Sequence, residues 1–138
     1  MSLIYSPKNN PRVIIIQKLY SKYFNDEVII FPKHRFKKFI KDVVNGTVER
    51  DEVINEEIKN HLDKDLNMKK LDKLFQVIIK CAIFEFLYKP KTSKNIIIKE
   101  YLNASNYFID ESQTKYLNAL LDKISKKIRI SNGWIRFN

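Results

Sequence analysis

The stretch LDKLFQVIIKCAIFEFLY, residues 71–88, decides the fold of this chain. Within its core only Lys80 and Glu85 interrupt a run of apolar side chains. A helix that is apolar on all sides has to be surrounded by other elements. The stretch therefore predicts a central helix near residues 74–88, which ends at Tyr88 because Pro90 follows.

Apolar residues recur at helical spacing on both sides of this stretch. Asparagine suits an N-cap and proline suits the first helical position, so Asn10-Pro11 predicts the start of a helix. The other predicted helices run from Pro32 to a C-cap at Asn45-Gly46, along Val53, Ile54, Ile58 and Leu62, over residues 93–107, and onward from a cap at Asp110.

The composition supports an all-α fold. The chain has 138 residues but only two glycines and four prolines, whereas antiparallel sheets need turn residues about every 8–12 positions. With 44% hydrophobic residues it can bury a sizeable core. We predict a compact bundle of about six to seven helices, in which two small helical subdomains, residues 1–66 and 67–138, share one core.

The charge balance points to a polyanionic partner. The formal net charge is +10, and each lysine or arginine that neutralises a phosphate releases a condensed counterion. The alternative is a lysine-rich surface kept for solubility. The predicted third helix is acidic and would steer RNA toward other faces.

No set of residues in the sequence suits catalysis. His34 and His61 stand in different helices without metal-ligand spacing, two glycines cannot build a phosphate loop, and the single cysteine, Cys81, lies in an apolar run. We therefore expect no enzyme activity, no cofactor and no metal. No apolar stretch is long enough for a membrane span, and the first residues carry no signal-peptide core, so we expect a cytoplasmic protein.

Two local patterns could contact RNA, and each has a structural alternative. The basic segment Lys33-His34-Arg35-Phe36-Lys37-Lys38 is either a phosphate-binding stripe or the polar side of an amphipathic helix. Tyr20 and Tyr116 lie beside basic residues, where an unstacked base could lie on an aromatic ring. On spacing alone, both tyrosines are better interpreted as core aromatics.

Five segments along the chain carry a recognisable pattern in one register. They are Arg12 through Gln17-Lys18-Leu19-Tyr20, Phe39 to Thr47, Val77 to Tyr88, Ile96 to Glu100, and Lys115-Tyr116-Leu117-Asn118-Ala119-Leu120-Leu121-Asp122-Lys123. Together they resemble the NusB family of bacterial antitermination factors, and the last segment is similar to that family's K-F-V-N-G-V-L-D-K.

The resemblance implies a function in transcription antitermination. Members of the family bind the boxA RNA element jointly with NusE, a small ribosomal protein, and help RNA polymerase to pass terminators. By resemblance, the RNA contacts are Lys8, Arg12, Tyr20, Lys115 and Tyr116. The partner contacts are Lys69, Lys73, Phe75, Gln76 and Lys80, with Phe75 either an exposed apolar anchor or simply core.

Two other functions remain possible on the sequence. A NusB-like domain precedes the catalytic domain of some ribosomal RNA cytosine methyltransferases, which fits poorly because no methyltransferase motif occurs up to residue 138. The chain could also be a helical protein–protein adaptor that has lost RNA binding. Its start, SPKNNPR, is poor in arginine for this family, so we expect useful RNA affinity to require the protein partner.

Overall fold

A computed structural model describes the backbone of residues 9–61 and 71–133. This part of the chain is all-α, as predicted, and holds six helices. None of them is long and apolar enough to cross a membrane. The predicted subdomain boundary at residues 66 and 67 lies outside the described residues. The helices are α1 (Pro11–Asn25), α2 (Lys37–Glu49), α3 (Asp51–His61), α4 (Lys73–Tyr88), α5 (Lys94–Ser105) and α6 (Glu111–Gly133).

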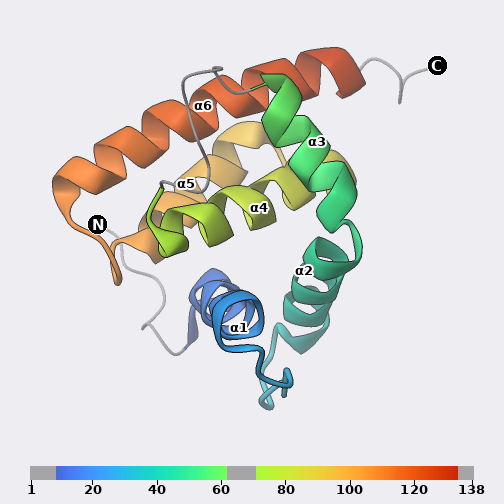
Figure 1. The fold of residues 1–138 in the computed structure, drawn as a ribbon, viewed down its shortest axis with the longest axis vertical. Helices are drawn as coiled ribbons and strands as arrows, with labels where there is room; N and C mark the ends of the chain where they lie inside the picture. The colour runs from blue at the N-terminus through green and yellow to red at the C-terminus, as the bar shows by residue number, and fades with distance from the viewer. Residues whose placement is uncertain (1–8, 62–70, 134–138) are drawn as a thin grey trace.

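The central helix is α4, which packs against α1, α2, α3, α5 and α6. In Figure 1 it runs through the middle of the molecule, with α6 along one side and α1 and α2 on the other. Ile78, Ile79 and Ala82 are completely buried, which confirms the predicted architecture. Cys81 is also buried, and burial raises the pKa of its thiol to about 12, so it is an apolar core residue and not a reactive thiol.

Several helix starts follow the predicted capping chemistry. The Asn10 side chain accepts hydrogen bonds from the backbone N–H groups of Arg12 and Val13, at 2.9 and 3.4 Å. Asp110 caps α6 in the same way, as predicted, and Ser93, at the expected start of α5, caps that helix. Because these side chains satisfy N–H groups that a helix leaves unpaired, they fix where each helix begins.

The boundaries of α2 differ from the prediction. The helix begins at Lys37 instead of Pro32 because His34 forms a turn first: its Nδ1 accepts the backbone N–H of Phe36 at 2.9 Å. The helix also continues through Gly46, where a C-cap was expected. A Cβ at Gly46 would lie 2.3 Å from the ring of Phe84, so this glycine serves close packing of α2 on α4. In α3, Ile54 and Ile58 are buried as predicted, but Val53 is 42% exposed.

Candidate nucleic-acid interface

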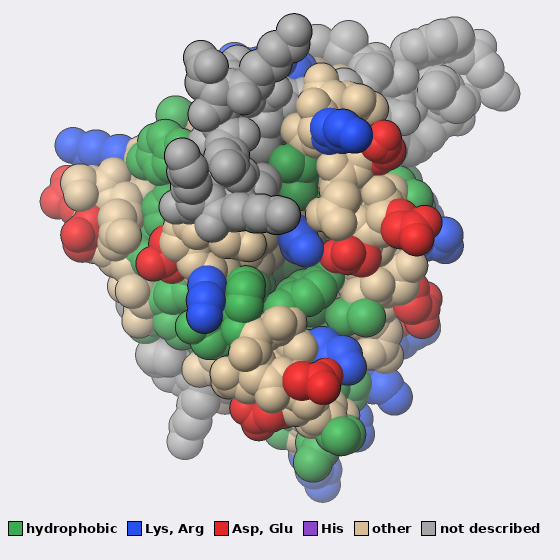
Figure 2. Space-filling view, viewed as in Figure 1, with side chains coloured by type: hydrophobic (Ala, Val, Ile, Leu, Met, Phe, Trp, Pro, Cys, Tyr) green, Lys and Arg blue, Asp and Glu red, His purple; other side chains and the backbone are tan. Residues whose placement is uncertain are grey.

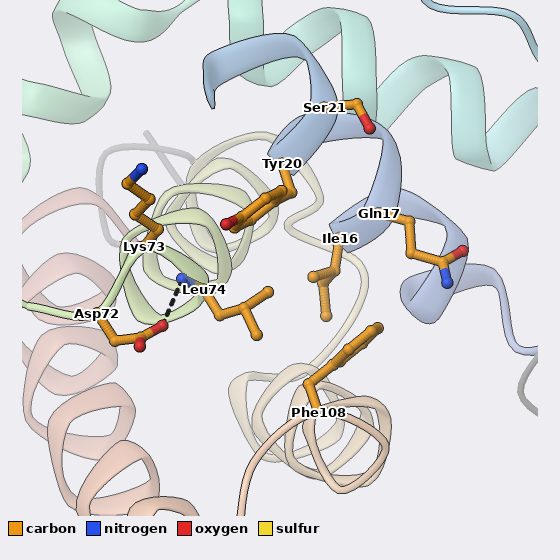
Figure 3. A pocket seen from close by; sticks show the side chains of 8 residues that line it. All are labelled: Ile16, Gln17, Tyr20, Ser21, Asp72, Lys73, Leu74 and Phe108. Carbon is orange, nitrogen blue, oxygen red and sulfur yellow. Dashed lines mark hydrogen bonds between the residues drawn. The ribbon is translucent and has the colours of Figure 1, made fainter. Parts of the chain in front are cut away.

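An open pocket lies where α1 meets the start of α4. It has a volume of about 470 Å³ and is lined by α1, by the start of α4 and by Phe108. Figure 3 shows Ile16, Tyr20, Leu74 and Phe108 directed toward the shared hollow. The lining residues are Ile16, Gln17, Tyr20, Ser21, Asp72, Lys73, Leu74 and Phe108.

The start of α4 places polar groups at the edge of this pocket. Asp72 caps the helix by accepting the backbone N–H of Leu74 at 2.8 Å. Lys73 is exposed, and its Nζ lies 5.1 Å from the ring centroid of Phe24. The ring of Tyr20 lies 5.2 Å from the same Phe24 ring. The pocket thus combines aromatic and aliphatic walls with one exposed cation.

Tyr116 lies on the other flank of α4. It is 45% exposed, and its ring stacks on Phe75 with centroids 5.8 Å apart. Its neighbour Lys115 has a side chain that is 78% exposed, with Nζ only 4.0 Å from Glu111 across one turn. An exposed ring held flat against a buried one offers a free face for stacking. Tyr116 is therefore exposed beside a buried ring, whereas Tyr20 is half-buried.

Arg12 is not placed for a phosphate contact. It is only 8% exposed, and its guanidinium binds Glu85 of α4 through two hydrogen bonds of 3.0 and 2.6 Å. Tyr101 of α5 donates its hydroxyl to the same carboxylate. Burial by itself would lower the pKa of Arg12, but Glu85, Tyr101 and Glu100 together outweigh it and the pKa is raised. Arg12 therefore ties α1 to α4, and the role expected from the sequence has to be corrected.

The predicted partner residues also divide by exposure. Lys73 is exposed, but Phe75 is only 3% exposed and belongs to the core, so it is not an exposed anchor. Gln76 is half-buried and donates to the Leu71 carbonyl at 2.9 Å. The side chain of Lys80 is 17% exposed and binds Asp51 at 3.1 Å.

The Lys80 pairing belongs to a small cluster that the sequence did not indicate. Tyr23 donates its hydroxyl to the same oxygen of Asp51 at 3.1 Å, and Lys80 Nζ lies 4.4 Å from the Tyr23 ring centroid. Burial and the nearby Asp51 carboxylate raise the pKa of Tyr23. The cluster joins α1, α3 and α4, so Lys80 helps to hold these three helices together. Two predicted residues, Lys8 and Lys69, lie outside the described residues.

The sequence matches the NusB family over residues 3–126. The chain belongs to the NusB family. Among similar proteins, the transcription antitermination protein NusB of Coxiella burnetii is 28% identical over 137 residues, covering 92% of this chain and 98% of that protein. Those of Rickettsia conorii and Lysinibacillus sphaericus are 29% and 30% identical, covering 82% and 64% of this chain and 76% and 69% of their own lengths.

A solved structure supports the fold of this NusB family member. T. maritima NusB superposes with a TM-score of 0.73 at 20% identity, covering 89% of this chain and 93% of that one. Relatives in the family are named as transcription antitermination proteins and not as enzymes. Within residues 9–61 and 71–133, no group of three or more histidine, cysteine or acidic side chains could hold a metal ion.

Proposed function

We propose that this NusB family member is a transcription antitermination factor that binds boxA-type RNA together with a NusE-like ribosomal protein. The observation that carries the proposal is the pair of aromatic surfaces flanking the start of α4. Tyr20 lines the pocket on one flank, and Tyr116 stacks on the other. Sequence-specific RNA recognition targets unstacked bases, which lie on such rings.

Among the described residues, Lys115 is the proposed phosphate contact near these rings, because it is exposed and precedes Tyr116. Lys8 remains a proposed contact on the sequence alone. Because the Arg12 guanidinium is bound to Glu85, this chain offers few phosphate contacts near the two tyrosine rings. Because each lost contact lowers RNA affinity, we infer that tight binding needs the basic surface of the partner as well.

The NusE-like partner is proposed to meet the exposed side of α4. Lys73 and Gln76 are the partly or fully exposed candidates among the described residues. Lys80 would contribute only after leaving Asp51. Phe75 is buried and holds the ring of Tyr116, so it is not part of the proposed partner face. Two binding surfaces that act on one RNA reinforce each other through effective concentration.

A titration of labelled boxA RNA with this chain alone, with the NusE-like protein alone and with both tests the proposal. We expect weak binding by the chain alone and much tighter binding by the pair. Tight binding by the chain alone that the partner does not improve would contradict the cooperative proposal. No binding to RNA, with partner binding retained, would favour the adaptor function, which the burial of Arg12 makes worth testing.

Single substitutions then locate the RNA site. Tyr116→Ala and Tyr20→Ala should each weaken binding by about 1–3 kcal/mol, as expected for the loss of one stacking ring. Tyr88→Ala is the matched control, because Tyr88 is also an exposed tyrosine (37%) but lies at the other end of α4. A short RNA of about six nucleotides keeps the test local to the start of α4. Equal effects of all three substitutions would place the RNA elsewhere.

A further inference from the structure

A basic stripe precedes and begins α2. It consists of Lys33, Arg35, Lys37, Lys38 and Lys41, all exposed. No aspartate or glutamate occurs between Glu27 and Asp42. Within the described residues, none of the five forms an ion pair with a carboxylate. Figure 2 shows Lys and Arg side chains along the lower right edge, over α2 and the loop before it, with acidic side chains above them over α3.

The stripe is attached to the start of α1. His34 Nδ1 accepts the N–H of Phe36, so the ring hydrogen lies on Nε2, which donates to the carbonyl oxygen of Asn9 at 3.1 Å. Asn9 stands two residues before α1. The segment that precedes α2 is therefore held against the residues just before α1.

Aromatic rings lie among these cations. The Arg35 guanidinium lies 4.9 Å from the ring centroid of Phe36, and Lys41 Nζ lies 5.8 Å from that of Phe31. Lys37 and Lys41 stand one helical turn apart, about 6 Å along the axis, close to the distance between successive phosphates of an extended strand. Charge that follows a backbone, interleaved with aromatic rings, is the pattern of single-strand binding grooves.

The opposite side of α2 is not available to a membrane. Ile40, Val43 and Val44 are at most 1% exposed, because α1 and α4 cover this face. An amphipathic helix binds a lipid surface by burying its apolar face there. With that face already buried, α2 presents charge alone, which suits a polyanionic strand.

We propose that the basic stripe is a second RNA-binding surface, which holds the phosphodiester backbone of single-stranded RNA outside the segment read at α1 and α4. This inference rests on the proposed RNA-binding function and extends it. The stripe would supply exposed positive charge for the RNA backbone. The charge of Arg12 is paired with Glu85 and is not available for this role.

The test compares two triple variants of the full chain with equal change in net charge. K33Q/K37Q/K38Q removes three stripe lysines for which the structure gives no ion pair or ring contact. K59Q/K91Q/K99Q is the matched control, with three exposed lysines on α3, on the loop before α5 and on α5. Thermal unfolding of both variants checks that the fold is kept. Binding is measured by fluorescence anisotropy with an RNA of about six nucleotides and one of about 16 nucleotides, over a salt series.

We expect K33Q/K37Q/K38Q to weaken binding of the longer RNA by about 10- to 100-fold at low salt and to reduce the salt slope by about two units, since single strands contribute about 0.7 per contact. The short RNA and the control variant should change little. Equal losses in both triple variants would overturn the stripe as a site and leave only diffuse charge. Binding of the stripe variant to polyglutamate and to anionic phosphatidylserine vesicles is measured as well. If this variant loses binding to either of them while its RNA binding is unchanged, the stripe is not an RNA-binding surface.

Failure of this inference differs from failure of the proposed function. If the stripe variant binds the longer RNA normally while Tyr116→Ala weakens the short one, only the stripe is wrong. If neither tyrosine variant affects the short RNA but the stripe variant still weakens the longer one, the RNA surface is the stripe and the α1–α4 site is wrong.

Discussion

Arg12 and Lys115 belong to the same group of cations in the sequence, yet they lie in opposite environments. The Arg12 side chain is 9% exposed and bound twice by the fully buried Glu85. The Lys115 side chain is 78% exposed and only 4.0 Å from Glu111, which is itself 89% exposed. A buried ion pair contributes to structure because breaking it strands a charge, whereas an exposed pair is worth little and leaves its cation free to bind. Burial therefore separates the charge that holds the structure together from the charge that remains available to the proposed RNA site.

Breaking the buried pair should have the largest effect. Arg12→Met leaves Glu85 as an unpaired buried carboxylate, and we expect a loss of about 3–5 kcal/mol in the free energy of unfolding. Urea unfolding measures it. The double variant R12M/E85L should be more stable than either single variant, because no buried charge is left over. Additive losses in this cycle would contradict the strong coupling of Arg12 with Glu85.

The stacked pair Phe75 and Tyr116 offers a second contrast between burial and exposure. Phe75→Ala should lower stability by about 3–5 kcal/mol, because it empties part of the core. Tyr116→Ala should lower stability far less and act mainly on RNA binding. Thermal unfolding and RNA titration of both variants check this division. If Tyr116→Ala proves as destabilising as Phe75→Ala, the Tyr116 ring is a core residue, as its spacing alone allowed.

The two sides of α2 provide a third contrast. Gly46→Ala places a Cβ against the ring of Phe84, and we expect about 1–3 kcal/mol of destabilisation from overpacking. The combination G46A/F84L should recover part of this loss, because leucine removes the ring atoms that clash. Substitutions in the basic stripe on the outer side should leave the unfolding temperature unchanged. A neutral Gly46→Ala would show that α2 and α4 can move apart.

The exposed pair Lys115–Glu111 should give the smallest change in stability. Lys115→Gln should shift the free energy of unfolding by no more than about 0.5 kcal/mol. Its effect should fall on RNA instead, lowering the salt slope by about 0.7. Lys126→Gln is the control, since Lys126 forms a similar exposed pair with Asp122 further along α6. Equal slopes for both variants would remove Lys115 from the proposed site.

The sequence by itself determined the helical class and most helix starts. These depend on local signals: apolar spacing along residues 74–88, and caps such as Asn10, Ser93 and Asp110 that bond to N–H groups two or three residues away. The sequence prediction was wrong at both ends of α2, because the bond of His34 to Asn9 and the close approach of Phe84 to Gly46 involve residues that are distant in the sequence.

Only the tertiary structure decided which charges and rings are available. The sequence alone does not pair Arg12 with Glu85, which is 73 positions away. The position of Glu85 inside an apolar helix indicated only that this carboxylate needs a buried partner. Likewise, spacing could not separate Phe75, which is core, from Tyr116, which is exposed. Exposure depends on which helices pack over a side chain, so the proposed binding surface forms only once α1, α4 and α6 are assembled.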